Sequence, residues 1–200
     1  MIIGIAVAAI VAGIILAVFA VTSSDSTTQY TESTAEFRSD GSIVVTSVES
    51  FEEDYYDEEE LRDMVDEAVD SYGSGVKKLS LSIENGVAIL EMKYDSAEDY
   101  VGFNDTDLFI GTVEEAENAG YDFQSIMSAV SQEDTSKILN EATLDQLLEN
   151  EVIILCEEVN IATDEGILYA TSNLGVTDET HASVIDTISE EMPAIIILKN

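Results

Sequence analysis

The 200-residue sequence contains one cysteine, one histidine, one proline and no tryptophan. Because Cys156 is alone, the chain has no internal disulfide framework, and it lacks the N-terminal cysteine that a lipoprotein signal requires. Cys156 follows the apolar run 152–155, so we interpret it as a small buried hydrophobe. One histidine and one cysteine also cannot supply the ligands of a standard zinc site.

Positive charge is also scarce. Lys and Arg number 7 against 42 Asp and Glu, which gives a formal net charge of −35. A nucleic acid needs a basic surface that neutralises its phosphates, so no nucleic-acid partner is expected. Docking of the water-facing part on anionic lipid is disfavoured for the same reason. Basic or neutral proteins and divalent cations are compatible with this charge, and so is a simple role in solubility.

Motifs of catalysis and cofactor binding are missing as well. The chain has no Gly-x-Ser-x-Gly elbow, and Gly73-Ser74-Gly75 lacks the Lys-Ser/Thr of a phosphate-binding loop. His181 stands beside Thr180 and after Asp178, a context typical of an exposed turn. We therefore assign no catalytic residue and no cofactor, and we expect a protein that is not an enzyme; a secreted hydrolase is the weakest alternative.

One long apolar segment is present, Ile2 to Val21, with twenty residues that are all apolar or Gly. As a helix it would be roughly 30 Å long, the thickness of the hydrocarbon core of a bilayer. The sequence predicts a transmembrane anchor over residues 1–21 and a polar linker over 22–33. The alternative is a cleaved signal peptide, because Val18-Phe19-Ala20 precedes Val21, but no basic residue precedes the apolar run.

Residues 34–200 are then expected to form an acidic domain outside the cytoplasm. The protein would be a single-pass protein of the cell membrane or, if the apolar segment is cleaved, a secreted one. The positive-inside rule gives no orientation, because Arg38 is the first basic residue. A single N-terminal anchor followed by a Ser/Thr-rich stalk usually carries its domain outward. The length suffices for one domain with a real core or for two small ones.

The hydrophobic pattern of 34–200 predicts an α+β fold, a mostly antiparallel sheet with packed helices. Two hairpins are expected, 34–51 around Asp40-Gly41 and 76–94 around Asn85-Gly86, the second with Leu79 opposite Met92. A helix over 57–72 carries one apolar stripe, capped by Asp57 and ended by Gly73. The inward residues of that helix would be Leu61, Met64, Val65, Ala68, Val69 and Tyr72.

Further helices are predicted over 97–103, from Thr112 to Gly120, around 123–130 and, broken or in two pieces, over 135–150. The last would bury Ile138, Leu139, Ala142, Leu147 and Leu148. Strands are expected at 152–161, 167–171, 182–185 and 194–198, with a turn at 164–166, and residues 108–110 are expected to form a strand or a buried turn.

Two oxygen-rich stretches are candidate cation sites, without an assigned ligand. Residues 49–70 hold twelve carboxylates and one base, Arg62, and the acids around Glu52 to Glu60 are the densest. Asn104-Asp105-Thr106-Asp107 is the second stretch. Calcium takes six to eight oxygen ligands, but neither stretch has the spacing of an EF-hand. We therefore favour a solvated helix face for the first stretch and a turn for the second. Tyrosines such as Tyr55, Tyr56 and Tyr121 would either form a protein-binding patch or border a small core.

The order Phe-x-x-Asp-Gly-Ser, strand, helix and paired strands through Met92-Lys93-Tyr94 resembles uncharacterised exported proteins of Gram-positive bacteria. These include LppM-like membrane-anchored domains and lipoproteins of gut Clostridia. The likeness spans roughly Phe37 to Phe103 and implies a location in the cell envelope. The anchor, the acidic charge and the lack of catalytic motifs predict a non-enzymatic extracytoplasmic domain that binds a protein or envelope component; the alternative is a surface module that binds, or is stabilised by, divalent cations.

Overall fold

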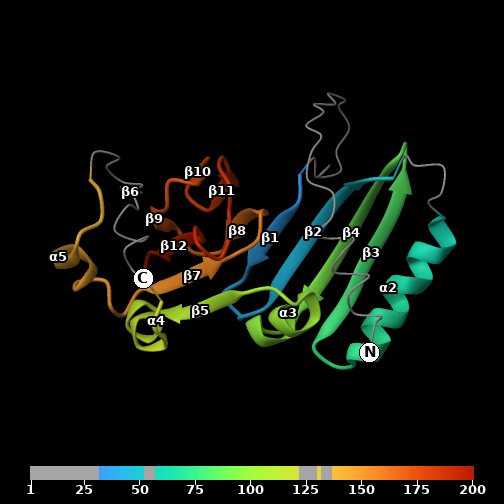
Figure 1. Ribbon diagram of the computed structural model, residues 1–200, viewed down its shortest axis with the longest axis horizontal. Coiled ribbons are helices and arrows are strands. Elements are labelled where there is room, and N and C mark those ends of the chain that lie inside the picture. Colours follow the sequence, from blue (N-terminus) through green and yellow to red (C-terminus); the bar gives the residue numbers. More distant parts are fainter. Residues whose placement is uncertain (1–31, 52–56, 122–129, 132–136) are drawn as a thin grey trace. The chain divides into compact units, whose positions relative to one another are not determined.

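The computed structural model describes residues 32–51, 57–121, 130–131 and 137–200 (Figure 1). Its strands are mostly antiparallel and its helices few, so the expected α+β class is confirmed. The described chain forms two compact units, one with Ser42–Asp105 and the described residues up to Ala35, the other with Glu36–Gly41 and the described part of Thr106–Asn200. The apolar segment 2–21 lies outside these ranges, and within them no helix is long and apolar enough to cross a membrane.

The first unit is a sheet with strand order β2-β4-β3 and two helices. Strands β2 (Ile43–Ser50), β3 (Val76–Glu84) and β4 (Val87–Tyr94) are antiparallel, and helix α2 (Glu58–Tyr72) lies along β3 (Figure 1). Asp57 caps α2 by accepting the N–H groups of Glu59 and Glu60, and Gly73 ends the helix with φ 97°. All six residues of the predicted stripe are buried or half-buried.

The hairpin β3–β4 has the predicted turn, because Asn85 and Gly86 both have positive φ. Its predicted pairing fails at one position. Lys78 pairs with Met92 and Ser80 with Glu91, so Leu79 is the extra residue of a β-bulge and is 50% exposed. The shift places buried Val76 opposite buried Tyr94, which an unbroken register would not do.

The Asp40-Gly41 turn also differs from the prediction. Five residues separate strand β1 (Thr34–Phe37) from β2. Within this loop the Gly41 N–H donates to the Arg38 carbonyl at 2.9 Å. Asp164 explains the longer loop: its carboxylate accepts the N–H and hydroxyl of Ser39 at 2.8 and 3.0 Å, and its own N–H bonds the Phe37 carbonyl. A partner 125 residues away therefore sets this turn.

Helix α3 (Ala97–Asn104) has Ser96 as its N-cap and completes the first unit. The second unit contains a five-stranded sheet of order β5-β7-β12-β9-β6. Central strands β7 (Glu151–Leu155) and β12 (Ala194–Leu198) are buried on both faces except at exposed Glu151, as the apolar runs 152–155 and 194–198 predict. The others are β5 (Leu108–Thr112), β9 (Ile167–Ala170) and β6 (Val130–Ser131).

One face of this sheet packs on the core residues Val113, Ala116, Leu139 and Leu144. The first two lie in helix α4 (Val113–Ala119), which Thr112 and Glu115 open with a capping box, and Leu144 ends the short helix α5 (Glu141–Leu144). The unit also contains an antiparallel set of order β10-β11-β8, made of β10 (Leu174–Val176), β11 (His181–Val184) and β8 (Asn160–Thr163).

Several predictions for this half were wrong in detail. In the described part of 135–150 only Glu141–Leu144 is helical, and Ile138 and Ala142 are exposed. The predicted strand 152–161 is two strands, and β10 was not predicted. The predicted helix around 123–130 lies outside the described residues except for Val130, which is in β6.

Candidate functional site

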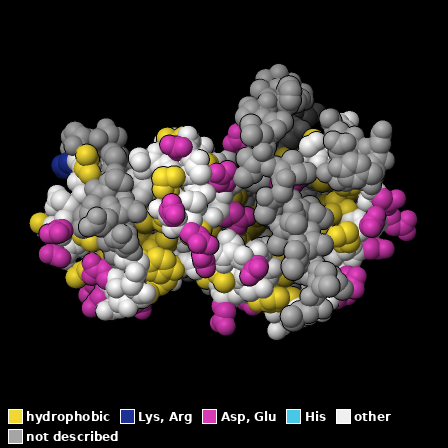
Figure 2. Space-filling view, in the orientation of Figure 1, with side chains coloured by type: hydrophobic (Ala, Val, Ile, Leu, Met, Phe, Trp, Pro, Cys, Tyr) yellow, Lys and Arg dark blue, Asp and Glu magenta, His cyan; other side chains and the backbone are white. Residues whose placement is uncertain are grey.

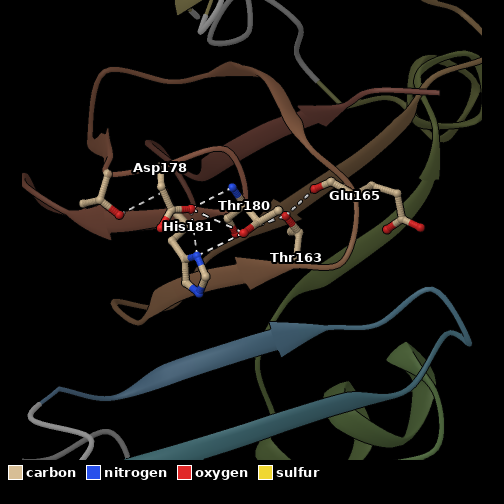
Figure 3. A network of polar contacts seen from close by, with 6 residues as sticks. Thr163, Glu165, Asp178, Thr180 and His181 are labelled. Atoms are coloured by element: carbon tan, nitrogen blue, oxygen red, sulfur yellow. Dashed lines mark hydrogen bonds and ion pairs between the residues drawn. The ribbon is translucent and has the colours of Figure 1, made fainter. Parts of the chain in front are cut away.

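The residues that most resemble catalytic groups lie together in the β10–β11 hairpin. His181 Nδ1 is 2.8 Å from Asp178 Oδ1 and 3.0 Å from the Thr180 hydroxyl (Figure 3). The Asp178 carboxylate also accepts the Thr180 N–H at 2.9 Å, which closes the turn. On the neighbouring strand the Thr163 hydroxyl donates to the carbonyl oxygen of Glu165 at 2.7 Å, and the Glu165 carboxylate points away from the histidine.

This arrangement is not a nucleophilic relay. A relay uses both ring nitrogens, one toward the orienting carboxylate and the other toward the nucleophile. Here Asp178 and Thr180 both meet Nδ1 of His181. The side chains of His181 and Asp178 are 55% and 60% exposed, so water surrounds the group. The network is therefore a turn that an exposed carboxylate stabilises.

The charge on that carboxylate is favoured by its partners. The hydrogen bond from the Thr180 N–H, followed by the one from His181, lowers the pKa of Asp178. This is the chemistry of a turn-forming aspartate, which stays ionised and fixes the backbone that follows it.

The candidate cation sites do not converge in the part of the chain that the structure describes. At the second stretch, Asn104 Oδ1 lies 3.3 Å from the Tyr94 hydroxyl, and its amide donates to the Tyr100 carbonyl at 3.0 Å. Asp105 has φ 54° and ends α3. No cluster of three or more His, Cys, Asp or Glu suited to a metal occurs among the described residues. In the acidic run, Asp57 is used as a helix cap, and residues 52–56 lie outside the description.

The tyrosines divide between core and surface. Tyr94 and Tyr100 are 3% and 1% exposed, and their rings meet edge to face at 5.0 Å. Tyr121 is 38% exposed and rests on Phe109, while Tyr55 and Tyr56 lie outside the described residues.

Cys156 is only half-buried and free, and burial, with Asp107 and Glu190 nearby, raises the pKa of its thiol.

The few cations are largely paired with neighbouring acids. Arg38 bonds Glu36, Lys78 bonds Asp66, and Lys199 bonds Glu179. Lys77 and Lys93, opposite each other on β3 and β4, both lie near Asp95. Figure 2 shows acidic side chains spread over the face in view, with few basic ones among them.

Two exposed apolar residues of the second unit share one structural support. Ile185 is 66% exposed and Met192 is 54% exposed. The Asn173 carbonyl accepts the Ile185 N–H at 3.0 Å, and the Asn173 side-chain amide donates to the Met192 carbonyl at 3.1 Å. No sequence pattern distinguishes them: Ile185 ends a predicted strand, and Met192 precedes the one proline.

Comparisons of the chain with models of protein families, with curated proteins and with solved structures found no match.

Proposed function

We propose that this protein is a non-enzymatic acidic domain, displayed outside the cytoplasm on an N-terminal membrane anchor, that binds a protein or envelope component. The observation that carries the proposal is the contrast between the uncharged segment 2–21 and a chain of net charge −35. Segment 2–21 has the length and composition of a bilayer span. The acidic remainder keeps a surface domain soluble and selects basic or neutral partners.

The geometry around His181 supports a binding role over a hydrolytic one. The aspartate and the threonine compete for a single ring nitrogen, in a place that water reaches freely. Such a site neither activates a hydroxyl nor excludes water from a reaction.

Membrane fractionation and surface proteolysis of the full chain test this proposal. We expect the protein to remain in the membrane pellet after alkaline carbonate, with its N-terminus intact, and to be degraded by protease added to intact cells. The matched variant Ile10→Asp with Ile14→Asp should move the protein out of the pellet, because charges at the centre of a span are costly. A mass that begins at Val21, or protection of the domain in intact cells, would contradict the anchored and displayed arrangement.

A further inference from the structure

We infer that Ile185 and Met192, bordered by Asp186, Glu190 and Glu191, form the surface that receives a cationic amphipathic segment of a partner protein. This inference rests on the proposed binding function and names its partner class. All five residues lie in one unit of the fold and all are exposed.

Single exposed apolar residues are common on protein surfaces, so exposure alone does not mark a binding surface. The distinguishing feature of this pair is the set of hydrogen bonds that holds the backbone of both residues. Asn173 bonds both loops that carry them: its carbonyl accepts the Ile185 N–H, and its side-chain amide donates to the carbonyls of Met192 and Pro193 at 3.1 and 3.2 Å. The Asn173 side-chain oxygen in turn accepts from the hydroxyl of buried Thr171 at 2.7 Å. The two apolar side chains thus stand on a backbone fixed to the core.

The segment between them is also held in place. Ile188 is 6% exposed and anchors the loop, and its N–H donates to Glu158. Ser189 and Met192 exchange backbone hydrogen bonds at 3.1 and 3.0 Å. A surface whose residues are already ordered loses little conformational entropy when a partner binds, which favours affinity.

The charge of the border identifies the occupant. Asp186, Glu190 and Glu191 are exposed, while Arg38, Lys78 and Lys199 pair with other acids, Glu36, Asp66 and Glu179. A second copy of this chain would bring its own acids to the border and be repelled. A segment that presents an apolar face between Lys or Arg residues satisfies both the apolar pair and the acids.

A binding titration of the full chain in zwitterionic detergent tests the surface, with empty micelles as the blank. The probe is a synthetic amphipathic helix with Leu on one face and Lys on the other; a scrambled peptide of equal composition and a Glu-for-Lys peptide are its controls. The variant Ile185→Ser with Met192→Ser should weaken binding roughly tenfold or more, because a few anchor residues supply most of the binding energy of an interface. Ile138→Ser, which removes a 60% exposed isoleucine elsewhere in the same unit, should leave binding unchanged.

A second comparison separates local charge from net charge. Asp186→Asn with Glu190→Gln and Glu191→Gln removes three charges at the border, and Asp63→Asn with Glu67→Gln and Asp70→Asn removes three from the exposed side of α2. The border variant should weaken binding several-fold more than the α2 variant. Equal effects of the two triples, unchanged binding by the Ser variant, or no binding of the amphipathic probe would overturn the inference. None of these results depends on cell fractionation, so the surface and the anchored display can fail separately.

Discussion

The side-chain amide of Asn150 donates to the carbonyl oxygen of Leu198 at 2.7 Å, across 48 residues of sequence. Both residues are buried, and the Asn150 carbonyl also accepts the N–H of Val113 at 3.0 Å. One asparagine therefore joins the start of α4 to the end of the central strand β12. This contact joins the last residue of β12 to Asn150, the residue directly before β7.

Asn150→Ala should lower the free energy of unfolding by about 1–3 kcal/mol, because the Leu198 carbonyl is left buried without that donor. Urea denaturation followed by circular dichroism measures the change. Asn118→Ala, at an exposed position of α4, is the control and should change stability by no more than about 0.5 kcal/mol. Equal effects of the two substitutions would show that the Leu198 contact does not contribute.

Local signals predicted the elements whose ends are determined nearby. Helix α4 begins and ends where Thr112, Glu115 and Gly120 require, and the Asn85-Gly86 turn sets the first pairs of its hairpin. The turn after β1 was predicted incorrectly because Asp164 holds it, and no local pattern reveals a partner so distant. The bulge at Leu79 was missed for a similar reason, because its cause lies away from the turn. Burial of Val76 opposite Tyr94 overrides the register that the Asn85-Gly86 turn begins.

The candidate site was predictable only in part. The sequence placed His181 correctly in an exposed setting, but the contact of Asp178 and Thr180 with the same ring nitrogen depends on how the hairpin folds. Ile185 and Met192 have no periodic pattern in sequence, and their common link through Asn173 exists only in three dimensions.

Calcium should stabilise the protein no more than its ionic strength does. The acids of a chain of net charge −35 repel one another, and added Ca²⁺ should act by screening that repulsion. Thermal melts in CaCl₂ and in NaCl of equal ionic strength make the comparison. A larger rise of Tm in CaCl₂, lost on addition of a chelator, would support the alternative of a cation-binding module.

The carboxyl of Glu49 should make stability fall as pH rises. Burial raises its pKa from 4.5 to about 7, so the folded state holds a proton that the unfolded state has released. Its contribution is complete below pH 4.5 and is lost as pH rises through about 7. Glu49→Gln should match the parent at low pH and exceed it above pH 7 by about 1 kcal/mol, a figure reduced for the partial exposure of this side chain.

Urea denaturation across that pH range tests the Glu49 prediction. Ser50→Ala, at the exposed neighbouring position, is the control for an altered strand end and should run parallel to the parent at every pH. A constant offset between Glu49→Gln and the parent would exclude titration of this carboxyl as the cause.

Replacing Gly75 with alanine should destabilise the protein for two separable reasons. Its φ of +99° is a conformation that L-residues rarely adopt, and an added Cβ would overlap the carboxylate of Asp99. Gly73 has a similar φ of +97° but open space around it. We expect Gly73→Ala to cost about 1 kcal/mol of unfolding free energy, from the backbone alone, and Gly75→Ala to cost about 2–4 kcal/mol.

A double-mutant cycle isolates the clash at Gly75. Asp99→Ala removes the carboxylate that accepts from the Ser96 hydroxyl at 2.7 Å, so it destabilises α3 when made alone. In that background Gly75→Ala should cost only about as much as Gly73→Ala does, because the overlapping atoms are gone and the backbone strain remains. The coupling energy between positions 75 and 99 is then the steric share of the penalty. Additive effects would mean that backbone conformation by itself requires glycine at position 75.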